Sequence, residues 1–541
     1  DSNIDLENEM RRIKGLVAVL LAVCTVFSVT GCDTVERIKE RISQETVDDE
    51  KVADENKTEV SNSISVGLLD FDTFNPLLTK SETVKECMEF VYEPLFELNE
   101  KLQAVPILAE SYTVSPDGRT IDITLKNNIQ WQDGSNFNAY DVSYTFKQIR
   151  SGVTNYTSVL ANMADYMATG DYTFQITLNY AVPNFVSLLT FPIVKYQSDM
   201  KGNANYIPMG TGPYKYNSQL STGKLLFSAF DNYHNGRAKI DSLYAYTVPD
   251  LQKYESMFEA SEIDLMTGRT VDLSEYTPRG SARNNEYITN QMTFIGYNTA
   301  NPLLSGVETR RGLSNIVDKD SIVNSTIYSR GKASNIPINP SSIFYYDTST
   351  KFKPDEILTT QHLGNDKWGL DNDGKYVRHV GAQKQVLQFE ILTNSDSAEK
   401  VNIANEVADS YTRFGIPTTV TALPYDEYIA RINAKNYDIM IGEIEVSANN
   451  DLTPLVSSTD NYFSYANPDL DMLIGQLGMT NDEEQQKALF RQYGDIIVND
   501  MPFTVLFFRK GNVMSGSKIK SEILPSVDRM FRNIETWSVT E

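Results

Sequence analysis

The spacing of apolar residues predicts a strand followed by a helix near the start of the folded part of the chain. Residues 64–69 form an apolar run of strand length. The next apolar residues at the i, i+3, i+4, i+7 spacing of one helical face are Val84, Cys87, Met88 and Val91. Pro94 cannot continue a helix, so we expect this helix to end at Tyr92. Its position on the apolar face predicts that Cys87 is a buried packing residue rather than a reactive thiol.

Strict alternation of apolar and polar residues occurs twice further along the chain. The apolar members are Ile121, Ile123 and Leu125 in one segment and Phe174, Ile176 and Leu178 in the other. Turn residues flank both segments, for example residues 116–118, which read Pro-Asp-Gly. Alternation with a period of two is typical of half-buried strands, so we expect two antiparallel strands here.

The later part of the chain follows a different pattern, in which strands and helices alternate. The expected strands are 387–391, 418–422 and 438–444, and the expected helices are the stripe Val401, Ala404, Ala408, Tyr411 and the segment 426–434. Gly415 follows the first helix as a plausible end signal. The order β-α-β-α-β is the unit of a parallel, doubly wound sheet. Together the two patterns predict two lobes of α/β class, and no repeat of fixed period indicates a solenoid.

Length and charge restrict the function. The 541 residues leave room for several structural units, and 41% hydrophobic with 22% charged residues is typical of a globular protein. The 48 Lys and Arg against 72 Asp and Glu give a net charge of −24. Such a charge repels phosphate backbones and anionic membrane surfaces, so we expect no nucleic-acid partner.

The beginning of the chain resembles a bacterial lipoprotein signal. Arg11, Arg12 and Lys14 precede a mostly apolar run over residues 16–29, and small residues lead to Cys32. We expect residues 1–31 to be the signal peptide and Cys32 to be lipidated. Acidic residues precede the basic ones, so translation is expected to begin at Met10. An uncleaved membrane anchor is the alternative, although the run is shorter than the ~20 residues a spanning helix needs.

The next segment has the composition of a tether. Residues 33–62 contain ten acidic and five basic residues and no aromatic residue, so this segment cannot bury enough apolar surface to fold alone. We expect residues 32–62 to be a disordered link between a lipid anchor and the folded body, with a short surface helix over 35–42 as a compatible alternative. Cys24 leaves with the signal and Cys32 carries lipid, so Cys87 has no disulfide partner.

No pattern of catalytic or cofactor-binding residues occurs. The chain has three histidines, His234, His362 and His379, expected in loops, none with a partner at metal-ligand spacing. Residues 371–374 imitate part of a calcium loop but lack the glutamate that completes it. Residues 210–213 read Gly-Thr-Gly-Pro and predict a tight turn rather than a phosphate loop, with a positive φ at Gly212. We therefore expect no catalytic residues, no cofactor and no bound metal.

Several segments in fixed order resemble the extracytoplasmic solute-binding proteins of oligopeptide, dipeptide and nickel ABC importers. The segments are TFNPLLT at 73–79, VYEPLFELNEKLQAVPILAESYTVSPDGRTIDITLK at 91–126, IQWQDGSNFNAYDVSYTF at 129–146 and MGTGPYKY at 209–216. Further similar segments are FDNYHNGRAKIDSL, YNTANPLLSGVETRRGLSNIVDKDSIV and KWGLDNDGKY. The resemblance extends over residues 64–541. Within it, Trp131, Asp141 and Tyr144 are expected to be packing and turn-fixing residues rather than ligand contacts.

The resemblance implies a hinged, two-lobed periplasmic-binding-protein-like fold of type II. Lobe I would comprise residues 63–95, 208–297 and 504–541, with an extra subdomain inserted at 96–207, and lobe II would comprise residues 298–503. The crossings between the lobes should fall near Asn298 and Pro502. Such a protein captures a solute between its lobes, performs no bond chemistry, and delivers the solute to an importer permease. We expect a monomer held by lipid at the outer face of the bacterial cytoplasmic membrane.

The resemblance also implies where the ligand binds. In peptide-binding members a carboxylate after the last strand of lobe II holds the ammonium terminus, and here that segment is 442–454, GEIEVSANNDLTP. It lacks the usual Trp and Asp, so the available anions are Glu443, Glu445 and Asp451, with Glu443 and Glu445 on one face of a strand. The loop Thr79, Lys80, Ser81 and Glu82 matches the ligand-side loop of lobe I. The alternative is that these carboxylates are solvated or pair with lysines.

The favoured ligand is a short peptide. An oligosaccharide or a metal chelate is the alternative, because the same fold serves both and tyrosine-rich clefts suit sugars. The scarcity of histidine disfavours nickel. An extracellular hydrolase is a third possibility. It would need a nucleophile with a base and an orienting partner, and the histidines provide no such arrangement.

Overall fold

The computed structural model describes residues 62–540, except residues 153, 199, 201, 203–204, 221–222, 268–281 and 349–351. The expected signal peptide over residues 1–31, the start at Met10, the lipidated Cys32 and all but the last residue of the tether over 32–62 lie outside the described residues. No helix in the described part of the chain is both long enough and apolar enough to cross a bilayer.

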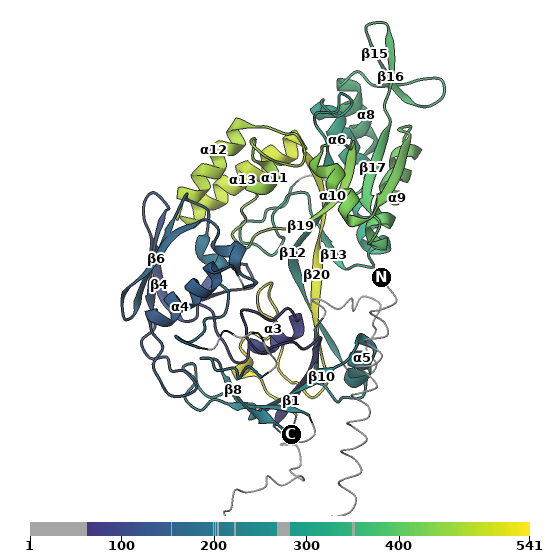
Figure 1. Cartoon of the computed structure of the whole chain (residues 1–541). Coiled ribbons are helices and arrows are strands. Elements are labelled where there is room, and N and C mark those ends of the chain that lie inside the picture. Colours follow the sequence, from purple (N-terminus) through teal and green to yellow (C-terminus); the bar gives the residue numbers. More distant parts are fainter. Residues whose placement is uncertain are drawn as a thin grey trace, which may run out of the picture. The chain divides into compact units, whose positions relative to one another are not determined.

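Eleven of the described strands form one continuous sheet that connects two lobes (Figure 1). These strands are β1 (Ser63–Leu69), β8 (Tyr214–Gln219), β9 (Leu225–Ala229), β10 (Ser242–Val248), β11 (Leu265–Thr267), β12 (Arg283–Tyr297), β13 (Gly331–Ala333), β17 (Phe389–Asn394), β18 (Thr418–Leu423), β19 (Ile439–Glu445) and β20 (Phe503–Ser515). Their order across the sheet is β18-β17-β19-β12-β20-β11-β1-β10-β9-β8, and β13 pairs with β20. The β11-to-β8 end is the base of the first lobe, and the β18-β17-β19 end is the core of the second.

The predicted first strand and helix are confirmed. β1 pairs in parallel with β10, and helix α3 (Glu82–Met88) follows, with Ser81 as its N-cap. The regular helix ends at Met88 rather than at Tyr92, because residues 89–92 continue as tight turns. Cys87 is buried in the core of the first lobe, and burial raises the pKa of its thiol.

A four-stranded antiparallel sheet, β4-β5-β7-β6, forms a separate layer of the first lobe. The elements of this region are β2 (Phe96–Leu98), β3 (Ala104–Pro106), β4 (Ala109–Val114), β5 (Thr120–Leu125), α4 (Ala139–Arg150), η1 (Thr157–Leu160), β6 (Met163–Gly170), β7 (Thr173–Leu178) and η2 (Phe185–Leu188). The two strands predicted from alternation are β5 and β7, which are antiparallel neighbours with Ile121 opposite Ile176. Gly118, in the turn before β5, has a φ of +69°, as its Pro-Asp-Gly turn indicates.

The second lobe contains the predicted β-α-β-α-β unit. β17 is followed by α9 (Ala398–Arg413), β18, α10 (Tyr425–Asn433) and β19, and β17 pairs in parallel with both other strands. β17 begins at Phe389, two residues after the expected start. Gly415 has a φ of +93° just beyond α9, which confirms it as the glycine that ends this helix.

Further elements complete the two lobes. They are α6 (Val307–Ile316), α7 (Lys319–Ser321), η3 (Ile322–Thr326), α8 (Glu356–Asn365), β14 (Gly369–Leu370), β15 (Tyr376–Val380), β16 (Gln383–Val386), α11 (Thr453–Val456), α12 (Pro468–Met479) and α13 (Glu483–Asp500) in the second lobe, with α5 (Leu251–Glu259) and η4 (Ile534–Thr536) in the first. Two histidines therefore lie in regular elements, His362 in α8 and His379 in β15, which corrects the expectation that all three lie in loops. Nδ1 of His362 lies 2.8 Å from Oε2 of Glu308 in α6.

β12 and β20 pass through both lobes and form the crossing. They pair at both ends, but between Ile288 and Met292 the β12 strand advances four residues while β20 advances two, from Lys510 to Phe508. Such a bulge bends a strand locally. Asn339 fixes it, since its Nδ2 donates to the carbonyl of Thr289 at 2.9 Å and to Oδ1 of Asn290 at 2.8 Å. The expected crossing points, Asn298 and Pro502, lie next to one end of these two strands.

The tight turn at residues 210–213 is needed for a different reason from the one its sequence suggested. Gly212 is absent from the residues with positive φ, so the expectation of a left-handed conformation is wrong. A Cβ at Gly212 would lie 2.8 Å from the carbonyl oxygen of Phe90, and one at Gly210 would lie 1.8 Å from that of Val91. Close approach of two backbones, not backbone torsion, therefore requires glycine at both positions.

Candidate functional site

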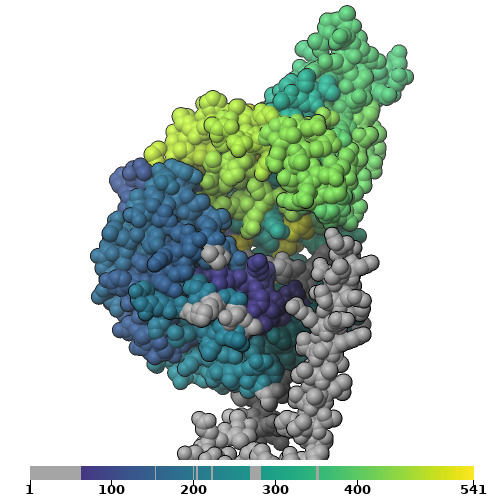
Figure 2. Space-filling model, viewed as in Figure 1, coloured from purple at the N-terminus to yellow at the C-terminus, as the bar shows by residue number. Residues whose placement is uncertain are grey.

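A cavity of about 620 Å³ lies between the two lobes. Its first-lobe wall comes from α3 and the turn after it, Pro94 before β2 and Leu98 at the end of β2, residues 155–159, residues 190–192 and the C-terminal segment 527–529. Its second-lobe wall consists of Asn290, in the bulge of β12, and residues 445–448 at the end of β19. Figure 2 shows the hollow between the segment around α3 and the second lobe. The volume falls within the range of about 300–1,000 Å³ that is typical of small-molecule sites.

The charged side chains of α3 on the first-lobe wall pair with each other. Glu82 and Lys85 form an ion pair one helical turn apart, and about a quarter of each side chain is exposed. Apolar and aromatic residues fill the space between the charges on this wall. Those that line the cavity are Met88, Tyr92, Pro94, Val159 and Pro192. The first-lobe wall therefore presents an apolar surface with internally paired charges.

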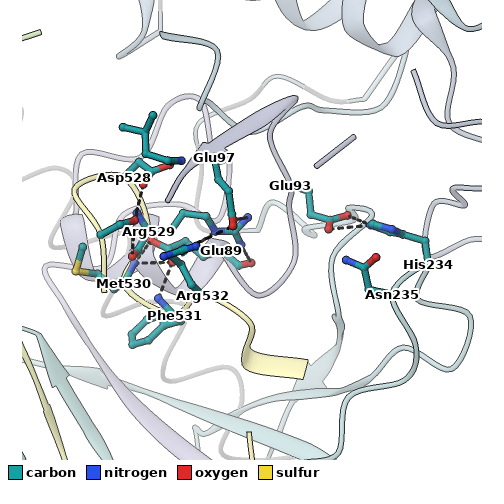
Figure 3. Close-up of polar contacts among 12 residues, drawn as sticks. Glu89, Glu93, Glu97, His234, Asn235, Asp528, Arg529, Met530, Phe531 and Arg532 are labelled. Atoms are coloured by element: carbon teal, nitrogen blue, oxygen red, sulfur yellow. Dashed lines mark hydrogen bonds and ion pairs between the residues drawn. The ribbon is translucent and has the colours of Figure 1, made fainter. Parts of the chain in front are cut away.

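Glu89 attaches the C-terminal segment to this wall (Figure 3). Its carboxylate accepts hydrogen bonds from the backbone N–H of Met530 at 2.9 Å and of Phe531 at 3.1 Å. In return, Nη2 of Arg529 donates to the backbone carbonyl of Glu89 at 2.8 Å. Asp528 accepts from the N–H of Leu98 at 2.8 Å. These bonds fix residues 527–529 as the floor of the cavity.

Arg529 of the floor and Arg532 beside it balance the buried glutamates (Figure 3). Glu97 lies 3.9 Å from Nη1 of Arg529 and 3.5 Å from Nε of Arg532. Burial raises the pKa of Glu97, and the two arginine charges oppose that effect only in part. Burial works against the charge of Arg529, but Glu89 and Glu97 outweigh it and raise its pKa. The glutamates and arginines of this cluster therefore balance each other's charges beneath the cavity.

Glu93 belongs to a second buried cluster beside the first (Figure 3). His234 Nε2 lies 2.9 and 3.0 Å from its two carboxylate oxygens, and the hydroxyl of Tyr233 donates to it at 2.8 Å. Both side chains of the His234–Glu93 pair are 2% exposed. His234 is therefore a satisfied core residue, not a ligand of the cavity.

Glu445 is the one acid of the second-lobe wall. It is an exposed residue at the end of β19 and lines the cavity. Its backbone pairs with Gln291 of β12, but no hydrogen bond or ion pair joins its side chain to another residue in the described part of the chain. Its neighbours on this wall are the small residues Ser447 and Ala448 and the buried Val446. Its carboxylate is therefore available to a cationic group in the cavity.

Glu443 lies on the same face of β19 but has a structural environment. Its carboxylate lies 3.1 Å from Nζ of Lys400 and 3.2 Å from Nη2 of Arg509. Burial alone would raise the pKa of Glu443, but the charges of Lys400 and Arg509 outweigh burial and hold it below its ordinary value. Glu443 is paired within the lobe, as the alternative of pairing with cationic residues anticipated.

The other residues named from the sequence shape loops. Thr79 donates to Asp72 at 2.5 Å, and the backbone N–H of Lys80 donates to Asp72 at 2.7 Å. Burial alone would raise the pKa of Asp72, but these hydrogen bonds hold it below its ordinary value. Ser81 caps α3, and Asp451 accepts from the backbone N–H of Thr453 at 2.9 Å. Of the seven named residues, the structure brings Glu82 and Glu445 to the described cavity.

The expected scaffold residues have the predicted role. Nε1 of Trp131 donates to Asp141 at 3.1 Å, and Asp141 also accepts from the backbone N–H of Asn138 and Tyr196. The hydroxyl of Tyr144 donates to the carbonyl of Ser198 at 2.9 Å. Sequence reasoning missed the cavity floor at residues 527–529 and Asn290 at the bulge. No local pattern marks either one.

Comparison with known proteins places the chain in a family. The family model described as bacterial extracellular solute-binding proteins, family 5 Middle, matches residues 103–466, which is more than half of the chain. The oligopeptide-binding protein AppA of Bacillus subtilis is 23% identical over 492 residues, which cover 86% of this chain and 89% of AppA.

Two solved structures share the fold. The nickel ABC transporter structure from Bacillus halodurans superposes with a TM-score of 0.74 at 21% identity, over 86% of this chain and 98% of that one. The unliganded open form of the periplasmic murein tripeptide binding protein MppA gives 0.75 at 17% identity, over 88% of this chain and 97% of that one. The two-lobed α/β fold of periplasmic binding proteins is therefore confirmed. The chain belongs to the bacterial extracellular solute-binding proteins of family 5, a family of transport proteins.

Proposed function

We propose that this protein captures short peptides in the cavity between its lobes and delivers them to an ABC importer. The observation that carries the proposal is Glu445, a carboxylate without a protein partner among the described residues, on one wall of an inter-lobe cavity. A peptide supplies the missing partner, since its terminal ammonium can donate charge-assisted hydrogen bonds to a carboxylate. The relative AppA is an oligopeptide-binding protein, and MppA is a murein tripeptide binding protein.

The rest of the cavity suits a peptide of varied sequence. The opposite wall offers Met88, Tyr92 and Pro192 for apolar side chains, and its charges are already paired. Residues 446–448 follow β19 and line the cavity, with a turn that begins at Ser447, so backbone groups of this segment can bond an extended peptide in the manner of strand addition. No step of bond making or breaking is proposed. Ligand favours the closed arrangement because only that arrangement contacts it from both walls.

We further propose the cellular setting that the sequence indicates. Residues 1–31 would be removed, a lipid on Cys32 would hold the protein at the outer face of the cytoplasmic membrane, and residues 32–62 would act as a tether. The tether keeps the binding lobes near the permease and raises their effective concentration there. The protein would act as a monomer and without enzyme activity.

A melting experiment tests the ligand. The purified protein is heated with a synthetic pool of tripeptides to pentapeptides, with a pool of oligosaccharides, and with nickel and histidine together. Because a ligand that binds the folded state raises the melting temperature, we expect a shift with the peptide pool alone. A shift with only the sugar pool or the nickel complex would reject peptide capture in favour of the corresponding alternative.

A pair of variants tests the residue. Glu445→Gln should weaken peptide binding by about tenfold or more, because it removes the charge that meets the ammonium. The matched control is Glu427→Gln, which changes an exposed acid on α10 of the same lobe, outside the cavity. Equal affinities of the two variants would refute the role of Glu445. Cleavage of the added peptides would support a hydrolase instead.

A further inference from the structure

The two lobes meet at a second place, at the rim of the molecule and away from the bulge in β12 and β20. On the first lobe the participants are the loop between β2 and β3, the turn before β5 and the residues that follow β7. On the second lobe they are the end of α12, the start of α13 and residues near 343. Figure 1 shows α12 and α13 beside the four-stranded sheet of the first lobe. We call this the rim contact, and it consists of Lys101, Gln103, Gly118 and Ala181 opposite Ile343, Gly478 and Glu483.

The closest part of the rim contact is between backbones. A Cβ at Gly478, near the end of α12, would lie 2.6 Å from the carbonyl oxygen of Ala181. A Cβ at Gly118 would lie 2.5 Å from the carbonyl oxygen of Gly478. Such distances are shorter than any side chain can accept, so both positions tolerate only glycine while the lobes touch. The two backbones therefore approach so closely here that no room remains for a methyl group between them.

Two hydrogen bonds flank this fit. Nε2 of Gln103 donates to Oε2 of Glu483 at 2.9 Å. The backbone N–H of Ile343 donates to the carbonyl of Lys101 at 3.0 Å. Each joins residues from different lobes, separated by more than 200 positions along the chain. Three separate points thus hold the same two surfaces together.

The second-lobe half of the rim contact is a single packed block. Leu477 of α12, Phe490 of α13 and Phe344 share one hydrophobic cluster with Ile336 and Ile338. The rings of Phe344 and Phe490 lie 4.6 Å apart. Because this cluster connects the three contributing segments, they move together when the lobes move.

The rim contact is incompletely packed, as expected of a contact that opens. A cavity of about 270 Å³ lies within it, lined from both lobes by residues that include Val114, Asn184 and Gln486. Nδ2 of Asn184 is buried there without a hydrogen-bond partner. Permanent interfaces are packed to the density of a protein interior, whereas interfaces between moving domains are smaller and more polar.

We propose that the rim contact is a latch that stabilises the arrangement of the lobes described here, in which residues of both lobes line one cavity, and that it sets ligand affinity from outside that cavity. This inference rests on the proposed function, because it assigns the rim a part in capture. A binding protein whose closed state is less populated binds its ligand more weakly by that fraction, even when every ligand contact is intact. Residues of the rim then determine affinity without touching the ligand.

The test uses two alanine variants of one helix. Gly478→Ala introduces a methyl group into the rim contact, while alanine is a better helix former than glycine and should not weaken α12 itself. Gly475→Ala is the matched control, because it lies in the same helix and a Cβ there meets nothing within 4 Å. Gly118→Ala is unsuitable, since its φ of +69° would strain any other residue. Gln103→Ala is a second variant that removes one hydrogen bond and adds no atoms.

The readouts on ligand-free protein are amide hydrogen exchange at Ile343 and the radius of gyration from small-angle X-ray scattering. For Gly478→Ala we expect exchange at Ile343 to be at least tenfold faster and the radius of gyration to be larger, with a weaker change in the same direction for Gln103→Ala. Gly475→Ala should match the wild type. With the synthetic pool of tripeptides to pentapeptides, we expect Gly478→Ala to raise the Kd by about tenfold.

Two outcomes overturn the latch. One is exchange and radius of gyration in Gly478→Ala equal to the wild type, and the other is the same change in both alanine variants. If the ligand-free readouts change as expected but no form of the protein binds the peptide pool, the latch stands and peptide capture fails. The failure of one proposal is therefore distinguishable from the failure of the other.

Discussion

The two walls of the cavity differ in how their charges are satisfied. On the first-lobe wall, Glu82 pairs with Lys85. The Glu89 carboxylate accepts a backbone N–H from Met530, and Arg529 donates to the backbone carbonyl of Glu89. Asp528 accepts a backbone N–H. On the second-lobe wall, Glu445 has no such partner in the described part of the chain. The charges of one wall are therefore satisfied within the protein, and the other wall carries a carboxylate that is exposed to the cavity.

The same contrast exists within a single strand. Glu443 and Glu445 are two residues apart on one face of β19, yet Glu443 lies between Lys400 and Arg509. Burial of a charge is tolerated when it is paired, and an unpaired charge remains where water or a ligand can reach it. The two acids of β19 thus differ in their partners, not in residue type.

The largest effect is expected from removing a charge on the first-lobe wall. Arg529→Ala would leave Glu89 and Glu97 buried without their shared cation. Breaking a buried charge cluster in this way costs about 3–5 kcal/mol of unfolding free energy, measurable by urea denaturation. Lys487→Ala, which removes the partly exposed partner of two exposed glutamates on α13, should cost less than about 1 kcal/mol. Equal losses would contradict the distinction between floor and surface.

A buried unpaired charge in the second lobe should give the next largest effect. Lys319 is buried, and burial lowers its pKa to about 7. Among the described residues its Nζ donates to neutral acceptors alone, to the Ser334 carbonyl at 3.1 Å and to Asn335 at 2.7 Å. In the unfolded chain the lysine has its ordinary pKa of about 10.4. Between about pH 10 and pH 7 the unfolded chain therefore holds a proton that the folded protein lacks. Stability should therefore fall as the pH falls through this window and become level below about pH 7.

Lys319→Met tests this pH dependence. Removing the charge should raise the unfolding free energy at pH 7 by about 2 kcal/mol and flatten its slope between pH 7 and pH 10. Lys332→Met, at an exposed position of β13, serves as the control and should change neither quantity. Chemical denaturation at a series of pH values measures both. A slope that persists in Lys319→Met would show that another group is responsible.

The sequence predicts those parts of the fold and site whose residues lie close together along the chain. The β-α-β-α-β unit and the β5–β7 pair follow from periodicity within short segments, and both were predicted with shifts of a few residues. The cavity floor was not, because Leu98 and Asp528 are 430 positions apart and one backbone hydrogen bond leaves no pattern in either segment. Likewise, alternation places Glu443 and Glu445 on one face, but Arg509, which covers Glu443, comes from β20.

The two acids of β19 should show opposite phenotypes. Glu443→Gln leaves Lys400 and Arg509 without one carboxylate and should cost about 1–2 kcal/mol of stability at pH 7. The folded pKa of Glu443 is lowered, so this contribution is present above the ordinary glutamate pKa and is lost as the pH falls through the lowered value. Glu445→Gln should change stability by less than about 0.5 kcal/mol while weakening peptide binding. Parallel denaturation and binding measurements would reject the contrast if either variant lost both properties.

The smallest effect is expected from the partly exposed ion pair of α3 on the first-lobe wall of the cavity. Lys85 and Glu82 are each about a quarter exposed, and ion pairs of this kind contribute about 0.2–1 kcal/mol because solvent screens them and both side chains lose rotamer freedom. Lys85→Met should therefore lower the unfolding free energy by no more than about 0.5 kcal/mol. It also leaves Glu82 as a second unpaired acid on the cavity, so peptides with a basic side chain should bind more tightly to Lys85→Met than to the wild type. Titration calorimetry with one peptide pool rich in lysine and one without it separates this gain from a general change in affinity. An equal change for both pools would mean that the charges of this wall are too well screened to affect the ligand.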